Sequence, residues 1–109
     1  MTRYCLALDL KQDPRLVAEY EAYHRAVWPE IKQSLLDSGI HNMEIYRTGN
    51  RLFMIMETSD YFSFEKKAQS DAANPKVQAW EQLMWKYQQA LPTARLGEKW
   101  ILMEKIFQL

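Results

Sequence analysis

The sequence has little of three residues on which many sites depend: one cysteine, three glycines and two histidines among 109 residues. Cys5 is the lone cysteine, which excludes a disulfide within the chain, and its apolar surroundings predict a buried small side chain. Two histidines far apart do not have the spacing of zinc ligands, so we predict no metal site. Three separated glycines cannot form a nucleotide-binding loop.

Long hydrophobic segments are also missing. No apolar run approaches the roughly 20 residues of a membrane span, and no basic-then-apolar leader precedes the first strand-like segment. Fourteen basic residues balance fourteen acidic ones, so the chain has no excess of positive charge with which to bind nucleic acid or an anionic membrane. We therefore expect a cytoplasmic protein that binds neither.

The remaining composition is that of one globular domain. Apolar residues make up 48% and charged residues 26% of the chain, which is typical of a folded protein. A chain of this length supports one hydrophobic core and not two. We therefore predict a single domain over residues 1–109.

Four segments of the chain are rich in strand-forming residues. The predicted strands are residues 3–10, 41–48, 51–57 and 100–107. Gly49–Asn50, between the second and third strands, is typical of a two-residue hairpin turn.

Three segments have the spacing of apolar residues that is typical of helices. The predicted helices run from Pro14 to about Gly39, over residues 61–72, and from Pro75 to Leu91. Asp13 and Asn74 each precede a proline and are predicted N-caps. Pro29 lies inside the first helical pattern and is expected to kink it or to split it at Trp28.

The order of these elements is the β-α-β-β-α-β pattern of ferredoxin-like α+β domains. The strand Leu52–Met56 has no polar residue on either face, whereas helices can cover only one face of such a sheet. A second copy packed sheet against sheet would cover the other face, so we predict a homodimer.

The segment from Tyr20 to Ile31 holds the strongest candidate for chemistry. Tyr20, His24 and Trp28 are four residues apart, so on a helix they stack along one side. Histidine titrates near neutral pH and would be the general acid/base if this column faces a cavity. The alternative is a structural histidine beside the core.

Other residues are weaker candidates. Trp85 has polar neighbours on its helix, which indicates contact with a sugar ring, with a partner subunit or with the C-terminal tail. Asp9 lies in an apolar strand and needs a partner, so it is a candidate for orienting His24 or a sugar hydroxyl. The side chains of Arg51 and Lys67 are interpreted as solvated charges.

Three segments together make the chain resemble the L-rhamnose mutarotases: Tyr20–Glu30 (YEAYHRAVWPE), Gly39–Tyr46 (GIHNMEIY) and Trp85–Tyr87 (WKY). The resemblance spans almost the whole chain. It implies a dimeric α/β-barrel of ferredoxin-like subunits that interconverts the α and β anomers of a 6-deoxy-L-hexopyranose, without metal or organic cofactor. It also implies that His24 is the proton donor and that Tyr20 binds the monosaccharide.

The chain departs from the family pattern at two positions. Met43 stands where members commonly have tyrosine, and Met84–Trp85 stands where they have a pair of tryptophans, so the sugar is either L-rhamnose or L-fucose. The predicted substrate contacts are Tyr20, Trp85, Met84, Met43, Trp28, Tyr46 and Asp9. A non-enzymatic dimeric sensor and a cofactor-free oxygenase-like enzyme on the same fold stay open as alternatives.

Overall fold

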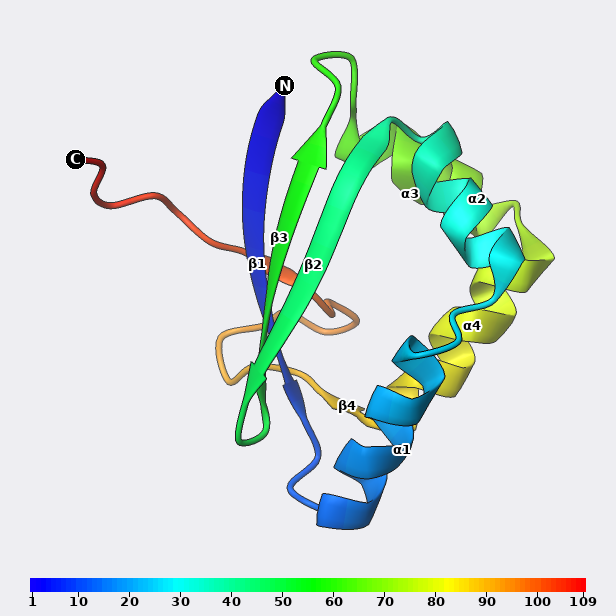
Figure 1. Cartoon of the computed structure of the whole chain (residues 1–109), viewed down its shortest axis with the longest axis vertical. Helices are drawn as coiled ribbons and strands as arrows, with labels where there is room; N and C mark the ends of the chain where they lie inside the picture. The colour runs from blue at the N-terminus through cyan, green and yellow to red at the C-terminus, as the bar shows by residue number, and fades with distance from the viewer.

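An antiparallel hairpin forms one side of the sheet. β2 (Ile40–Thr48) and β3 (Arg51–Thr58) meet at Gly49–Asn50, and Gly49 has the positive φ, 56°, that this turn requires. β1 (Thr2–Leu10) pairs antiparallel with β3 along nearly its whole length. The computed structural model describes residues 1–109 and shows these three long strands side by side (Figure 1).

Two short strands complete the sheet on the other edge of β1. β4 (Gln88–Gln89) and β5 (Ile101–Leu102) both pair antiparallel with β1. The sheet order is β2-β3-β1-β4, with β5 also on β1. β4 was not predicted, because two glutamines after a helix carry no strand pattern.

The prediction of a strand over residues 100–107 is wrong beyond Leu102. The backbone N–H of Met103 still donates to the carbonyl of Cys5 over 2.7 Å, after which the chain leaves the sheet (Figure 1). The apolar side chains of Ile106 and Phe107 are exposed. No second layer covers this side of the sheet, so nothing within the chain packs against them.

Four helices follow the predicted segments, but the segment predicted over residues 61–72 begins three residues later and the last helix ends earlier than predicted. They are α1 (Pro14–His24), α2 (Pro29–Asp37), α3 (Phe64–Ala72) and α4 (Pro75–Trp85). The caps are confirmed, because the carboxylate of Asp13 accepts from two backbone N–H groups of α1 and the amide oxygen of Asn74 does the same for α4. None of the four helices has the length and apolar character that crossing a membrane requires.

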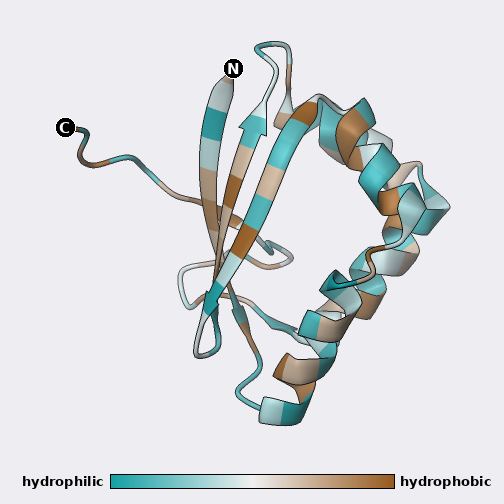
Figure 2. Cartoon of the chain, in the orientation of Figure 1, coloured by the Kyte–Doolittle hydropathy of each residue, from teal (hydrophilic) through white to brown (hydrophobic).

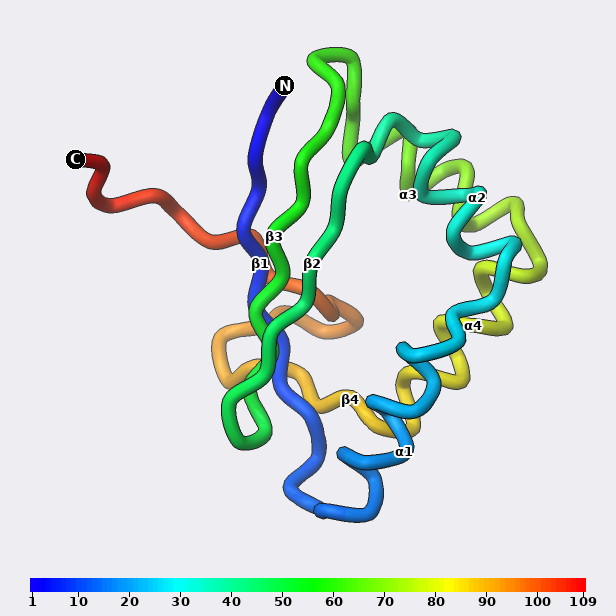
Figure 3. The backbone as a smooth tube through the Cα atoms, viewed as in Figure 1, coloured from blue at the N-terminus to red at the C-terminus, as the bar shows by residue number.

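The first helical segment is split at the predicted place. Trp28 has φ −55° and ψ 135°, an extended conformation favoured before proline, and Pro29 begins α2. The trace therefore turns between His24 and Pro29 instead of continuing as one rod (Figure 3). His24 thus ends α1, and α2 runs in a new direction.

The last helix is shorter than predicted. α4 ends at Trp85, and Tyr87 follows in a turn rather than in the helix. Tyr87 is nevertheless buried in the core beside Tyr20 and Tyr23. Its apolar side chain therefore continues the predicted stripe although its backbone is not helical.

The helices cover only one face of the sheet (Figure 1). On that face, Leu8 and Leu10 of β1 and Leu52 of β3 are buried, whereas Phe53 and Ile55 on the other face are only half-buried. Apolar colour therefore appears along the strands as well as on the helices (Figure 2). Cys5 also lies half-buried on the uncovered face, so the prediction that it is buried is wrong within one subunit.

Truncation of Leu8 tests where the core lies. Leu8 is 0% exposed, so Leu8→Ala should lower the free energy of unfolding by about 2–5 kcal/mol through lost transfer energy and a residual cavity. Urea unfolding followed by circular dichroism at one fixed protein concentration measures the change. Leu36→Ala, at a leucine 59% exposed on α2, is the control and should change it by less than about 0.5 kcal/mol. Equal losses for both variants would contradict this placement of the core.

Candidate active site

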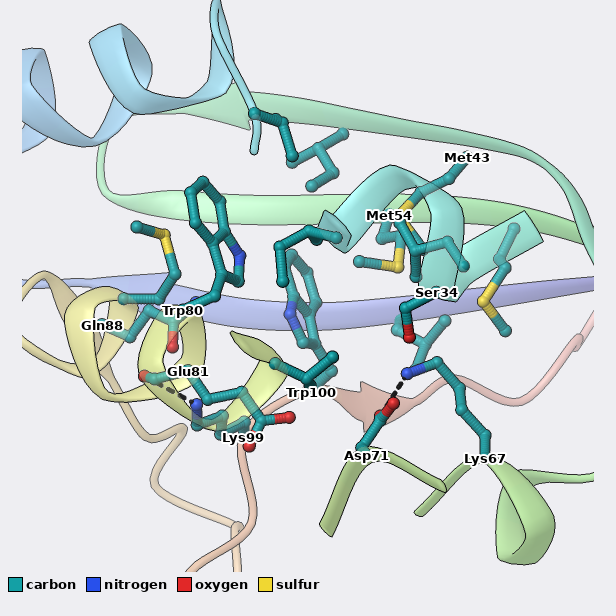
Figure 4. A pocket seen from close by; sticks show the side chains of 18 of the residues that line it. Ser34, Met43, Met54, Lys67, Asp71, Trp80, Glu81, Gln88, Lys99 and Trp100 are labelled. Carbon is teal, nitrogen blue, oxygen red and sulfur yellow. Dashed lines mark hydrogen bonds and ion pairs between the residues drawn. The ribbon is translucent and has the colours of Figure 1, made fainter. Parts of the chain in front are cut away.

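A cavity of about 490 Å³ lies between the helices and the covered face of the sheet. Most of its wall is apolar: Leu6, Met54 and Met56 come from the strands, and Val27 and Ile31 from α2 and the segment before it. A few polar side chains interrupt this wall (Figure 4). An apolar cavity with a few placed polar groups is the usual form of a small-molecule site.

His24 lines this cavity at the end of α1, and one of its ring nitrogens forms a hydrogen bond within the protein. Its Nδ1 lies 2.9 Å from the backbone carbonyl oxygen of Tyr20. A carbonyl only accepts hydrogen bonds, so Nδ1 carries the hydrogen and Nε2 is the unprotonated nitrogen of the neutral ring. His24 therefore has one nitrogen that can take a proton.

The surroundings of His24 favour its neutral form. Burial lowers the pKa of the imidazole below its ordinary 6.5, and the bond to the Tyr20 carbonyl opposes this shift. Burial lowers the pKa because the apolar wall hydrates the imidazolium poorly. At neutral pH His24 is consequently a base, and its cation becomes an acid as soon as it forms.

Tyr20 supports His24 and also brings a hydroxyl to the cavity. Its ring lies against the imidazole, with centroids 4.3 Å apart. Burial raises the pKa of the phenol above its ordinary 10.0, and a hydrogen bond from Gln88 opposes the rise. Tyr20 therefore stays un-ionised and serves as a hydrogen-bonding group.

Trp80 takes the place that the sequence pattern predicts for Trp28. The helix ends before Trp28, whose ring packs on Trp80 with centroids 5.1 Å apart and does not line the cavity. Trp80 lines the cavity and meets the ring of His24 edge-on, at 5.7 Å between centroids. The second aromatic neighbour of His24, after Tyr20, is thus contributed by α4, from a residue predicted only as core.

Charged side chains mark the other end of the cavity. Lys67 of α3 donates to the carboxylate of Asp71, and Ser34 lies near this pair (Figure 4). The prediction that Lys67 is a solvated charge is wrong, because its side chain is only 22% exposed. Lys99 also lines the cavity: burial lowers the pKa of its ammonium group, and the charge of Glu81 opposes this.

Four of the predicted substrate contacts lie away from this cavity. Trp28 packs on Trp80, and Trp85 carries the Lys99 ammonium group over its ring, 4.8 Å from the centroid. Asp9 pairs with Arg51 over 2.7 Å rather than with His24. Tyr46, one residue from the cavity-lining Ile45, points to the uncovered face because side chains alternate along a strand.

The remaining predicted residues meet in one place. Tyr20, His24, Met43 and Met84 come from α1, β2 and α4, and all line the cavity. No three histidine, cysteine or acidic side chains converge on a point where a metal ion could bind. The cavity thus holds one imidazole in a largely apolar wall, with the charged side chains of Lys67, Asp71 and Lys99 also on its lining.

Comparison with known proteins places the chain in a family. The family model described as L-rhamnose mutarotase matches residues 3–109. The chain belongs to this family. An L-fucose mutarotase of Xanthomonas campestris is 47% identical over 100% of this chain and 89% of its own length. An L-rhamnose mutarotase of Phocaeicola vulgatus is 37% identical over 80% of this chain and 76% of its own length.

Solved structures show the same fold. The crystal structure of an L-rhamnose mutarotase from Formosa agariphila matches with a TM-score of 0.73 at 24% identity, over 100% of this chain and 99% of that one. The tetracenomycin F2 cyclase of Streptomyces glaucescens matches with a TM-score of 0.63 at 17% identity. The prediction of a sugar mutarotase, an isomerase, is confirmed over the sensor and oxygenase-like alternatives by the family and its relatives.

Several residues that line this cavity were missed from the sequence. Trp80 was assigned to the core stripe, and Trp100 only to a strand, although both line the cavity. Lys67 and Asp71 are four residues apart, a spacing that signals an ion pair on a helix but not the face it occupies. Gln88 gave no signal, because nothing in the sequence places it beside Tyr20.

The tautomer and pKa of His24 can be measured directly. Because burial disfavours the imidazolium, the titration midpoint of His24 should lie below 6.5. NMR spectra that correlate the ring nitrogens and carbon-bound hydrogens should give this midpoint and show Nδ1 protonated in the neutral form. His24→Asn identifies the signal by removing it. A midpoint above 6.5, or an Nε2–H tautomer, would contradict the described geometry.

Proposed function

We propose that this protein interconverts the α and β pyranose anomers of a 6-deoxy-L-hexose, with His24 as the acid/base residue. The observation that carries the proposal is the hydrogen bond between Nδ1 of His24 and the carbonyl oxygen of Tyr20. This bond leaves Nε2 as the unprotonated nitrogen in a largely apolar cavity. Mutarotation requires a proton to leave the anomeric hydroxyl and a proton to reach the ring oxygen. A neutral imidazole can do the first and its cation the second.

Ring opening begins at the anomeric hydroxyl. His24 Nε2 takes the proton of this hydroxyl, a carbonyl forms at C1, and the bond from C1 to the ring oxygen breaks. The imidazolium then gives its proton to the ring oxygen, which becomes the C5 hydroxyl. Both oxygens are attached to C1, so one nitrogen can serve both transfers, and the product is the free aldehyde.

Reclosure runs the same steps in reverse on the other face of the carbonyl. The aldehyde turns about the C1–C2 bond, and His24 takes the proton of the C5 hydroxyl as its oxygen attacks C1. The proton returns to the carbonyl oxygen, which becomes the new anomeric hydroxyl. The low pKa of His24 suits both directions, because a weakly held proton is readily returned.

No step changes an oxidation state, and His24 alone supplies the proton transfers. We therefore propose that the reaction uses neither metal nor organic cofactor.

The free thiol of Cys5 suits a reducing compartment, which agrees with a place in the cytoplasm.

The walls of the cavity suit a deoxy sugar. The indoles of Trp80 and Trp100 offer faces on which C–H groups of a pyranose pack (Figure 4). Met43 and Met84 add apolar surface that suits the methyl group of a 6-deoxy sugar. L-fucose is the first candidate, since the 47% identical relative is named for it, and L-rhamnose is the second.

We further propose that the subunit pairs with a second copy through the uncovered face of the sheet. Tyr46, Phe53, Ala7 and Ile101 lie side by side across four strands on this face. The segment after β5, residues 103–109, has exposed apolar side chains and leaves the sheet on the same side (Figure 1). A monomer would leave this surface in water, whereas sheet-to-sheet packing would bury it as the predicted dimeric α/β-barrel does.

Replacement of His24 tests the proposed function. His24→Asn keeps an N–H that can reach the Tyr20 carbonyl but has no titratable nitrogen, so anomer exchange should slow by roughly 10²–10⁴-fold. Saturation transfer between the anomeric protons of L-fucose and L-rhamnose measures the exchange. The wild-type kcat/KM should fall as pH decreases through a midpoint below 6.5, because the base form is lost. A folded His24→Asn protein with wild-type exchange would refute the assignment.

A charge on the uncovered face tests the dimer. Wild-type protein should sediment with twice the chain mass of 13.0 kDa, and Phe53→Lys should shift it to the monomer because a buried unpaired ammonium group is costly. Leu36→Lys puts the same charge on an exposed leucine of α2 and should stay dimeric. A monomeric wild type at micromolar concentration would disprove the interface.

A further inference from the structure

Gln88 is a buried side chain on the cavity wall that the acid/base mechanism does not use. It belongs to β4, pairs with Leu10 of β1, and is only 5% exposed. It lines the cavity at the end opposite the pair of Lys67 and Asp71 (Figure 4). Its amide is thus held close to the helix that carries Tyr20 and His24.

Only half of this amide has a partner. Its Nε2 donates to the hydroxyl of Tyr20 over 3.2 Å, whereas Oε1 is buried with no hydrogen-bond partner. A buried carbonyl without a donor destabilises the fold, and an apolar side chain of the same shape would avoid that penalty. No donor comes from the protein, so a bound ligand is the natural source of one.

The position of Gln88 indicates which ligand group it meets. Tyr20 stands between Gln88 and His24: its hydroxyl accepts from Gln88, and its ring lies 4.3 Å from the imidazole. In the proposed function, C1 of the sugar lies at His24. A sugar hydroxyl close to Gln88 is then one attached near C1, and C2 is the only carbon next to C1 that carries a hydroxyl.

We infer that Gln88 is a specificity-determining residue whose Oε1 accepts a hydrogen bond from the hydroxyl on C2 of the sugar. The inference rests on the proposed function. It also gives the ring-opened aldehyde a fixed point, because C1 turns about the C1–C2 bond while the C2 hydroxyl is held. L-rhamnose and L-fucose differ in configuration at C2, so this contact distinguishes them.

A substrate lacking the C2 hydroxyl, paired with a variant lacking the amide, isolates this contact. Exchange rates are measured by saturation transfer for L-fucose and 2-deoxy-L-fucose, each corrected for its uncatalysed rate. The ratio of the L-fucose rate to the 2-deoxy-L-fucose rate should be roughly three- to ten-fold larger for wild type than for Gln88→Met. This variant removes the acceptor at nearly constant volume. Gln89→Met changes the exposed neighbouring glutamine and should keep the wild-type ratio.

A conservative variant separates recognition from structure. Gln88→Glu keeps an acceptor at this position and should retain more of the preference for L-fucose than Gln88→Met does. It also serves as the test if Gln88→Met does not fold. A wild-type ratio in folded Gln88→Met, or no preference in Gln88→Glu, would overturn the inference. Wild-type protein that accelerates neither sugar would overturn the proposed function and, with it, this inference.

Discussion

Pro29 has no amide hydrogen and keeps Trp28 in an extended conformation, so one long apolar stripe is divided between α1 and α2. α1 ends at His24, and the chain bends before α2 begins. Ile31 of α2 can then line the same cavity as Tyr20 and His24 instead of continuing along one straight helix. The place of the imidazole therefore depends on this break in the chain.

The cavity combines a largely apolar wall with groups held ready for a ligand. The wall keeps the imidazole of His24 neutral, and the Tyr20 carbonyl holds its Nδ1. The same burial leaves Oε1 of Gln88 without a donor. The unpartnered Oε1 reduces stability in the absence of a ligand, which is the usual compromise between stability and activity in a binding site.

The uncovered face of the sheet explains where strand prediction failed. Residues 100–107 have the apolar content of a strand, yet only Ile101–Leu102 pairs with β1. The rest of the segment carries Ile106 and Phe107, which have no surface within this chain to cover them. An apolar pattern predicts that a residue is buried, and in the proposed dimer these side chains would be buried by the partner subunit.

Local interactions were therefore readable from the sequence: the hairpin at Gly49–Asn50, the caps at Asp13 and Asn74, and the break at Pro29 each depend on residues close in the chain. The family motif around His24 was readable for the same reason. Trp80, Lys67 and Gln88 reach the cavity of His24 only because α3 and α4 fold over the sheet and β4 pairs with β1. Spacing along the chain determines which residues share a helix face, whereas the packing of distant elements decides which faces enclose a cavity.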